Sequence, residues 1–476
     1  MAALASKKLS LDNRKLLSTT VLYGIADVIV MAVGGFLLLP LYTRTLSQAE
    51  FGTYVVVKAN TEIFTYLVCL GLPSAVSRVY FDYRKVGQQA SYITSILLFF
   101  VLGLAVLLTL LAVWGDRLWG LLSPGTPATP FLAFSVALAA AGFTSTLGTL
   151  WLRLEGRAKA FALAQVATAA MLSICAVVNL TWMDLGLPGL LWAMLISTAA
   201  AGLLLPWLLG RGFRPVFHWE HIRSSLPFAG PSLLGYLAYF LVNRIGTLVL
   251  QRHAPMDDIA VFGLSQQLAL IVTMAAGAFG KAQQPAIFGA EPAEAAQILD
   301  RAGRLLRWMM LGVTSLLLLF SSELMALVAP KNYGNDIHIL LILLIANFTY
   351  SLSQVSDTAL LYHRRPRESV SVSIFGALLS TGLSLLLVPR YHAAGAAAAI
   401  AVTAVAMTLL SYGLAWRVTG HSYMATLLGS LAAATAIAVL AAWLPTLGWP
   451  AALTAVFKLS LFTALAGAFA WRHFRQ

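Results

Sequence analysis

Long apolar stretches separated by short polar gaps occupy nearly the whole chain of 476 residues. Fourteen of them reach about the 20 residues that a helix needs to cross ~30 Å of hydrocarbon. The stretches are residues 17–41, 51–77, 88–114, 127–150, 160–181, 188–209, 226–250, 259–287, 306–329, 336–361, 368–389, 394–416, 423–443 and 448–471. The pattern predicts an all-α integral membrane protein with fourteen transmembrane helices.

The basic residues divide unevenly between the gaps. The N-terminus, the C-terminus and every second gap hold 22 of the 31 Lys and Arg residues, whereas the other gaps hold five. Basic residues of short loops stay on the cytoplasmic side. We therefore expect a multi-pass protein of the cytoplasmic (inner) membrane, with both termini in the cytoplasm.

The bulk composition removes other classes of protein. Hydrophobic residues make up 59% of the chain and charged residues 10%, a balance that soluble domains do not have. The formal charge of +13 would suggest nucleic-acid binding in a soluble protein, but here it follows from the loop bias, so we expect no nucleic-acid partner. Cys69 and Cys175 both fall inside spans and the eight His are scattered. We expect no metal site and no cofactor.

An internal repeat appears when the sequence is shifted by 208 residues. Residues 44–54 then align with 252–262 without gaps, and 156–159 align with 364–367. With a two-residue drift, 185–189 also align with 391–395. A repeat of six spans predicts two six-helix lobes of the same orientation, spans 1–6 and 7–12, related by an axis along the membrane normal. The expected organisation is a cytoplasmic N-terminus (1–16), an N-lobe (17–210), an inter-lobe linker (211–225), a C-lobe (226–416), and spans 13 and 14 with the C-terminus (417–476).

Three segments carry a resemblance to a known family. They are Leu39–Tyr54 (LPLYTRTLSQAEFGTY), Gly71–Phe81 (GLPSAVSRVYF) and Leu152–Ala158 (LRLEGRA). The chain resembles the Wzx-type polysaccharide flippases of the multidrug/oligosaccharidyl-lipid/polysaccharide exporter superfamily, which serve O-antigen and exopolysaccharide synthesis. The resemblance implies export of a polyprenyl-diphosphate-linked oligosaccharide by alternating access coupled to an ion gradient, as in an antiporter. It also implies membrane lipids, a polysaccharide polymerase and other assembly proteins as partners.

Polar residues lie on one face of several predicted helices, at steps of three and four. An ionisable group in hydrocarbon costs roughly 2.5–3.5 kcal/mol on insertion scales, so each needs a reason. For such a substrate we expect Arg244 and Lys281 to bind the diphosphate or an acidic sugar at successive depths about 20 Å apart. Aromatic rings that could stack on sugars are Tyr236, Tyr239 and Tyr350, and further substrate-binding candidates are Asn243, Gln266, Gln284, Lys58 and Arg78. Asp27 and Glu62 are the candidates for ion coupling.

Several alternatives remain open at this stage. The intramembrane charges could form buried ion pairs that only hold the bundle together, and Lys458, isolated in the last span, is interpreted as snorkelling to the surface. A lipid II flippase and a multidrug cation antiporter of the same superfamily are rival functions. A membrane polymerase or ligase is disfavoured, because no outer gap exceeds about 13 residues and none could fold as a domain. We therefore do not expect an enzyme.

Overall fold

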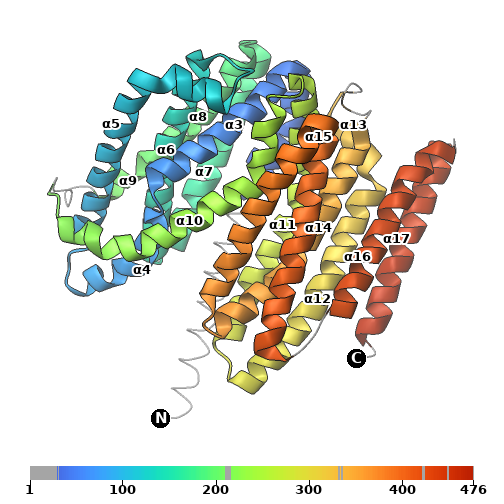
Figure 1. Cartoon of the computed structure of the whole chain (residues 1–476). Helices are drawn as coiled ribbons and strands as arrows, with labels where there is room; N and C mark the ends of the chain where they lie inside the picture. The colour runs from blue at the N-terminus through green and yellow to red at the C-terminus, as the bar shows by residue number, and fades with distance from the viewer. Residues whose placement is uncertain are drawn as a thin grey trace. The chain divides into compact units, whose positions relative to one another are not determined.

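The computed structural model describes residues 29–30, 32–209, 216–330, 333, 336–420, 424–447 and 450–474. Within these residues the chain is helical and contains no β-strand (Figure 1). The elements are η1 (Val33–Leu37), α2 (Leu39–Thr45), α3 (Gln48–Cys69), α4 (Leu72–Lys85), α5 (Gln89–Leu122), α6 (Ala128–Leu154), α7 (Ala158–Val177), η2 (Val178–Trp182), α8 (Gly186–Gly202), α9 (Leu204–Leu209), α10 (Trp219–Leu250), α11 (Met256–Phe288), α12 (Pro292–Leu319), α13 (Ser321–Val328), α14 (Ile337–Tyr362), α15 (Pro366–Thr419), α16 (Met424–Trp443), η5 (Leu444–Leu447) and α17 (Ala451–Phe474).

The helices agree with the hydropathy pattern. Among the described residues, ten helical stretches are long and apolar enough to cross a membrane. The prediction of an all-α integral membrane protein is therefore confirmed, and the number of fourteen spans stays a prediction. α15 covers the two predicted spans 368–389 and 394–416 and is interrupted at His392, where φ is 47° and ψ is −127°.

One predicted boundary is wrong. The stretch expected to end at residue 114 continues as α5 to Leu122, so Asp116 and Arg117 lie within a helix and not in a gap. Trp119, which is only 1% exposed, holds this end by donating its indole N–H to the carbonyl oxygen of Thr126 at 3.0 Å. A buried tryptophan with a backbone partner stabilises these last helical turns although two charged residues lie within them.

The start of α3 shows how the sequence sets a helix end. Ser47 precedes the helix and accepts a hydrogen bond from the backbone N–H of Glu50 at 3.3 Å. The Glu50 carboxylate accepts in return from the backbone N–H of Ser47 at 2.9 Å. This capping box satisfies two of the donors that a helix N-terminus leaves without intrahelical partners. The Ser-x-x-Glu of the segment 39–54 therefore has a structural role.

The backbone repeats with the period that the sequence predicted. α3 and α11 begin 208 residues apart, as do α7 and α15. The unusual backbone conformations repeat as well: Gly156 and Arg364 have positive φ, and so do Asp184 and His392. Each pair is separated by 208 residues, so the repeat has no drift at residue 184. The two-residue drift was predicted because it aligns glycines of the two loops. In the structure, the feature that the loops share is a residue with positive φ.

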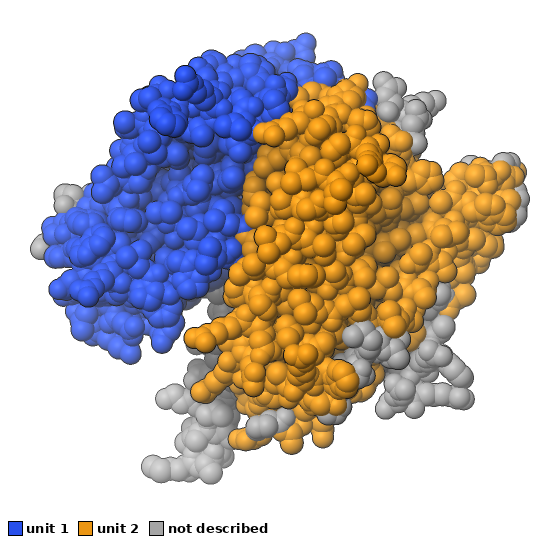
Figure 2. Space-filling model, in the orientation of Figure 1, with its two compact units in different colours: residues 1–237 blue, residues 238–476 orange. Residues whose placement is uncertain are grey.

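The chain forms two compact units, Met1–Leu237 and Ala238–Gln476 (Figure 2). Unit 1 has a large apolar core in which α3, α4, α5 and α6 contribute buried side chains such as Tyr80, Tyr92 and Phe143. Unit 2 is built around α14 and α15, which run side by side (Figure 1), with α11 and α12 packed against α14. The domain boundaries expected from the sequence stay a prediction.

Gly71 is placed where only glycine fits. The break between α3 and α4 passes through Leu70 and Gly71, both with positive φ. A Cβ at Gly71 would lie 2.1 Å from the carbonyl oxygen of Ala229 on α10. The glycine of the segment 71–81 therefore allows both a left-handed turn and a close approach of two backbones.

Candidate functional site

A polar cluster joins α10 and α11 in unit 2. Arg244 on α10 donates through Nη1 to Oε1 of Gln266 on α11 at 3.0 Å. The Nε2 of Gln266 donates to the carbonyl oxygen of Asn243 at 2.7 Å, and Gln266 is 4% exposed. The buried amide of Gln266 thus uses its acceptor on the Arg244 guanidinium and its donor on the backbone of the preceding residue, Asn243. Because glutamine is neutral, this contact orients the guanidinium and leaves its positive charge in place.

The neighbours of this cluster differ in exposure. The side-chain amide of Asn243 donates to the carbonyl oxygen of Tyr239 at 2.9 Å, which keeps it close to its own helix. The Tyr239 side chain is 46% exposed. Three residues predicted as separate site members, Asn243, Arg244 and Gln266, are therefore brought together in one cluster, and Tyr239 lies one turn away from it.

Tyr236 belongs to a second cluster, in unit 1. Its ring stacks on Tyr66 of α3, with centroids 5.5 Å apart and planes inclined by 10°. Its hydroxyl lies 2.6 Å from the hydroxyl of Ser74 on α4. One face of the Tyr236 ring is covered by this stacking.

The remaining predicted site residues of unit 1 that the structure describes lie on α3 and α4. Lys58 on α3 is partly buried, with its ammonium 5.9 Å from the ring centroid of Tyr54. Glu62 is one turn further along the same helix and is partly buried, whereas Arg78 on α4 is exposed. The repeat places Lys58 at the position equivalent to Gln266, because the two residues are 208 apart.

Of the other predicted residues, Lys281 is described only in part and Asp27 not at all. Lys281 and Gln284 lie on α11, and the Gln284 side chain is exposed. For Lys281 only the helical backbone is described. Asp27 lies outside the described residues.

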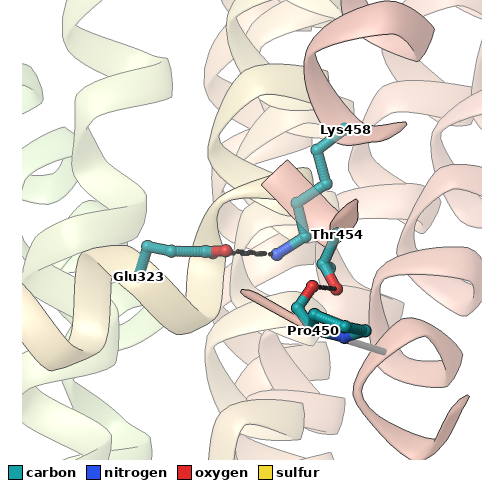
Figure 3. A network of polar contacts seen from close by, with 4 residues as sticks. All are labelled: Glu323, Pro450, Thr454 and Lys458. Atoms are coloured by element: carbon teal, nitrogen blue, oxygen red, sulfur yellow. Dashed lines mark hydrogen bonds and ion pairs between the residues drawn. The ribbon is translucent and has the colours of Figure 1, made fainter. Parts of the chain in front are cut away.

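Lys458 forms a buried ion pair, so the interpretation that it snorkels is wrong. Its side chain is 3% exposed, and its Nζ donates to Oε1 and Oε2 of Glu323 at 2.7 and 2.9 Å (Figure 3). Glu323 lies on α13 and its side chain is 49% exposed. The pair joins residues 135 positions apart. No pattern within the last span could have revealed it.

Asp357, a carboxyl group on α14, was not among the predicted site residues. Asp357 accepts a hydrogen bond at 3.0 Å from the hydroxyl of Ser411 on α15. The Ser411 hydroxyl lies 2.7 Å from that of Ser356, one helix position before Asp357. The sequence shows a carboxylate in an apolar helix, which is a signal for a functional site. It does not show the serine partner, which lies 54 residues away.

Ser356 also lines a cavity of about 140 Å³ in unit 2. Its other walls are Ala296, Leu299, Val355, Ala359, Tyr362, His363, Tyr412, Ala415, Val418 and Thr419. Sites for drug-sized ligands measure about 300–1,000 Å³, so this cavity is too small for an oligosaccharide. A water takes up about 30 Å³, so the cavity has room for a few waters.

Comparison with known proteins identifies both a family and a fold. The profile of the family described as "Polysaccharide biosynthesis protein" matches residues 17–290, and no curated protein matches the chain. The structure is similar to the lipid II flippase MurJ in an inward closed conformation, with a TM-score of 0.71 and 11% identity over 98% of this chain and 100% of that one. It is also similar to a multidrug resistance MATE family transporter of the MOP superfamily. The inward-facing conformation gives a TM-score of 0.63 and 17% identity over 84% of this chain and 94% of that one. The outward-facing conformation gives 0.59 and 18% over 84% and 95%.

Proposed function

Since the chain belongs to the polysaccharide biosynthesis protein family, we propose that it is a flippase for a polyprenyl-diphosphate-linked oligosaccharide. It would move this substrate from the cytoplasmic to the outer leaflet of the cytoplasmic membrane, for cell-surface polysaccharide synthesis. The substrate has an anionic diphosphate and a hydrophilic glycan, and both need polar partners while they cross hydrocarbon. The transporter folds that the chain resembles support movement across the membrane as the general activity.

The observation that carries the proposal is the Arg244–Gln266 contact. A guanidinium can bind phosphate oxygens through two parallel N–H donors. Gln266 fixes one edge of the Arg244 guanidinium by accepting from Nη1 at 3.0 Å. A fixed guanidinium loses less conformational freedom when a phosphate binds. Arg244 on α10 would be one binding site for the diphosphate, and Lys281 on α11 would be another. Tyr239, exposed one turn away, is placed to stack on a sugar ring.

Two rival functions are weighed by the same evidence. A lipid II flippase is favoured by the similarity to MurJ over 98% of this chain, whereas the MATE structures cover 84%. Lipid II is itself a polyprenyl-diphosphate-linked glycan, so the two proposals share their chemistry and differ in the sugar. A multidrug cation antiporter is disfavoured, because the polar cluster between α10 and α11 is centred on a cation, Arg244.

The test is transport by the purified full-length chain in proteoliposomes, with a lipid-linked oligosaccharide and lipid II supplied in separate reactions. Hydrogen bonds to charged groups contribute about 1.5–3 kcal/mol, so Arg244→Ala should slow transport by about 10- to 150-fold. Arg244→Lys should recover part of the rate. Arg252→Ala, at an exposed arginine just after α10, is the matched control and should transport normally.

A further variant tests whether Arg244 binds the substrate or only stabilises the fold. Gln266→Glu preserves an acceptor for Arg244 but adds a negative charge beside the guanidinium and removes the donor to the carbonyl oxygen of Asn243. Its Tm is therefore measured beside its transport, which should be slow in the protein that stays folded. A purely structural role of Arg244 predicts that this variant transports at the wild-type rate. If Arg244→Ala and Gln266→Glu both transport at the wild-type rate, the proposal that Arg244 binds the diphosphate is refuted. Transport of lipid II alone would replace the oligosaccharide as the substrate.

A further inference from the structure

Asp357 ends a chain of hydroxyl groups that starts at the cavity in unit 2. Ser356, which lines the cavity and is 4% exposed, lies 2.7 Å from the hydroxyl of Ser411. Ser411 in turn lies 3.0 Å from Oδ1 of Asp357. At the other side, Ser356 is 2.7 Å from the carbonyl oxygen of Ser353. The cavity, two hydroxyls and a carboxyl group are therefore connected in series.

Counting hydrogens shows that this series has two arrangements. Its three contacts join Asp357 to Ser411, Ser411 to Ser356, and Ser356 to the carbonyl of Ser353. Each contact needs one hydrogen, and the two serines supply two. With an ionised carboxylate, both serines point toward it and the carbonyl of Ser353 receives no hydrogen from Ser356. With a protonated carboxyl group, both serines turn toward the carbonyl and all three contacts are made.

The lining of the cavity combines exposed and buried residues. His363 and Ala296 are exposed, and Ser356 is buried. Tyr362, Tyr412 and Thr419 are further hydroxyl-bearing residues of the lining. A cavity that has polar partners and room for a few waters can hold them. The predicted topology places the loop of His363 on the cytoplasmic side.

The internal repeat indicates that the fold itself does not need these groups. Residues 208 positions before Asp357, Ser411 and Ser356 are Thr149, Leu203 and Gly148. Unit 1 therefore builds the equivalent helices without a carboxyl group and without either serine. A carboxyl group in an apolar helix is costly, and such groups commonly mark proton or ion pathways.

Titratable residues near Asp357 come from its own helix and from the helices packed against it. Tyr350 on α14 and Tyr412 on α15 are two of them. Among the helices packed against α14, α12 has Arg307, which faces Tyr412, and α13 has Glu323, which is paired with Lys458. α11 carries Asp257, Asp258 and Lys281, and α16 contains no titratable residue.

We propose that Asp357 is a proton-binding site and that Ser411 and Ser356 exchange its proton with water in the cavity. The inference deepens the proposed function, because it names the proton as the ion whose gradient drives the flippase. In the loading direction, Ser411 gives its proton to Asp357 and takes one from Ser356. Ser356 takes one from a hydronium ion in the cavity, which becomes water. The sum is one proton moved from the cavity to the carboxylate, and release is the reverse.

The test uses the full chain in proteoliposomes, with a pH gradient and a clamped membrane potential. Asp357→Asn should transport the lipid-linked glycan at a rate that no longer depends on the pH gradient. Ser411→Ala interrupts the series and should lower the gradient-driven rate at least tenfold. Ser380→Ala is the matched control, because Ser380 is a buried serine of the same helix whose hydroxyl donates to the carbonyl of Val242 at 3.2 Å. It should behave as wild type.

An infrared titration gives a readout that needs no glycan. Between acid and alkaline pH, wild type should lose one protonated-carboxyl band that Asp357→Asn lacks and Ser411→Ala shifts. If wild type transports the glycan and Asp357→Asn keeps its dependence on the pH gradient, the inference is wrong and the proposed function stands. Transport that follows a Na⁺ gradient and ignores pH also overturns it. If wild type transports no glycan, the proposed function fails, and the absence of the Asp357 band then overturns the inference as well.

Discussion

The buried ion pair between α13 and α17 predicts an unequal response to the loss of each partner. The Lys458 side chain is 3% exposed and that of Glu323 is 49% exposed. Glu323→Gln leaves the ammonium of Lys458 buried without its carboxylate, near the ring of Phe320 at 5.7 Å from the centroid. Lys458→Met removes the buried charge and leaves a carboxylate that is half-exposed and can find other partners.

The magnitudes follow from this difference. Breaking a buried pair so that one charge stays buried costs about 3–5 kcal/mol, and we take about 3 because one partner is half-exposed. Leaving an exposed charge without its partner costs about 0–1 kcal/mol. In a unit of about 240 residues, 1 kcal/mol shifts the Tm by about 2–4 °C, so Glu323→Gln should lower it by about 6–12 °C. Lys458→Met should lower it by about 4 °C or less. The double variant, Glu323→Gln with Lys458→Met, should be close to wild type, since it leaves no charge without its partner.

Thermal unfolding of the purified, detergent-solubilised chain, followed by tryptophan fluorescence, measures all four proteins under one condition. The coupling between the two sites is the difference between the double variant and the sum of the single variants. Equal effects of the two single variants, or a double variant as unstable as their sum, would refute the pairing. If Lys458 instead reached the surface independently, Glu323→Gln would leave the Tm unchanged.

Two further predictions concern the backbone and the topology. Gly71→Ala should prevent unit 1 from folding, because its Cβ would lie 2.1 Å from the carbonyl oxygen of Ala229, whereas Gly87→Ala, with a similar φ and nothing within 4 Å, should cost only about 1–2 kcal/mol. Membrane-localised, monodisperse protein from Gly71→Ala at the level of Gly87→Ala would contradict this. The charge bias predicts that reporter fusions read outside after residues 120 and 185 and inside after residues 86 and 215; a reversed pattern at either pair would overturn the orientation.

The sequence predicted the fold well because hydrophobic thickness and helix rise leave few choices. The described apolar stretches form helices, although the stretch 51–77 is broken at Leu70 and Gly71. The 208-residue period is found again in the helix starts and in the positive φ of Asp184 and His392. The continuation of α5 through Asp116 and Arg117 was missed, because a charged pair in the sequence resembles a loop unless the buried Trp119 is known. Local patterns define an element, but its end depends on tertiary contacts.

The candidate site was less predictable, because helical periodicity places a residue on a face without naming its partner. Arg244 and Gln266 were both selected from polar stripes, and only the structure shows that they touch. The partner of Lys458 could not be deduced, since Glu323 lies 135 residues earlier in a different apolar stretch. Its burial and its ion pair both result from how α13 and α17 pack.

The repeat separates the charges that the fold requires from those that one unit has acquired. Glu50 of unit 1 has an acidic equivalent in Asp258, and both residues lie in the first turn of a helix, where a negative charge is stabilising. Lys58, by contrast, is equivalent to Gln266, and Asp357 to Thr149. A charge that both units share in the first turn of a helix is explained by the fold alone. A charge in the apolar part of one helix is not required by the common fold when the equivalent helix of the other unit lacks it. By this argument, mutagenesis at Lys58 and Asp357 should alter transport more than folding, and at Glu50 and Asp258 the reverse.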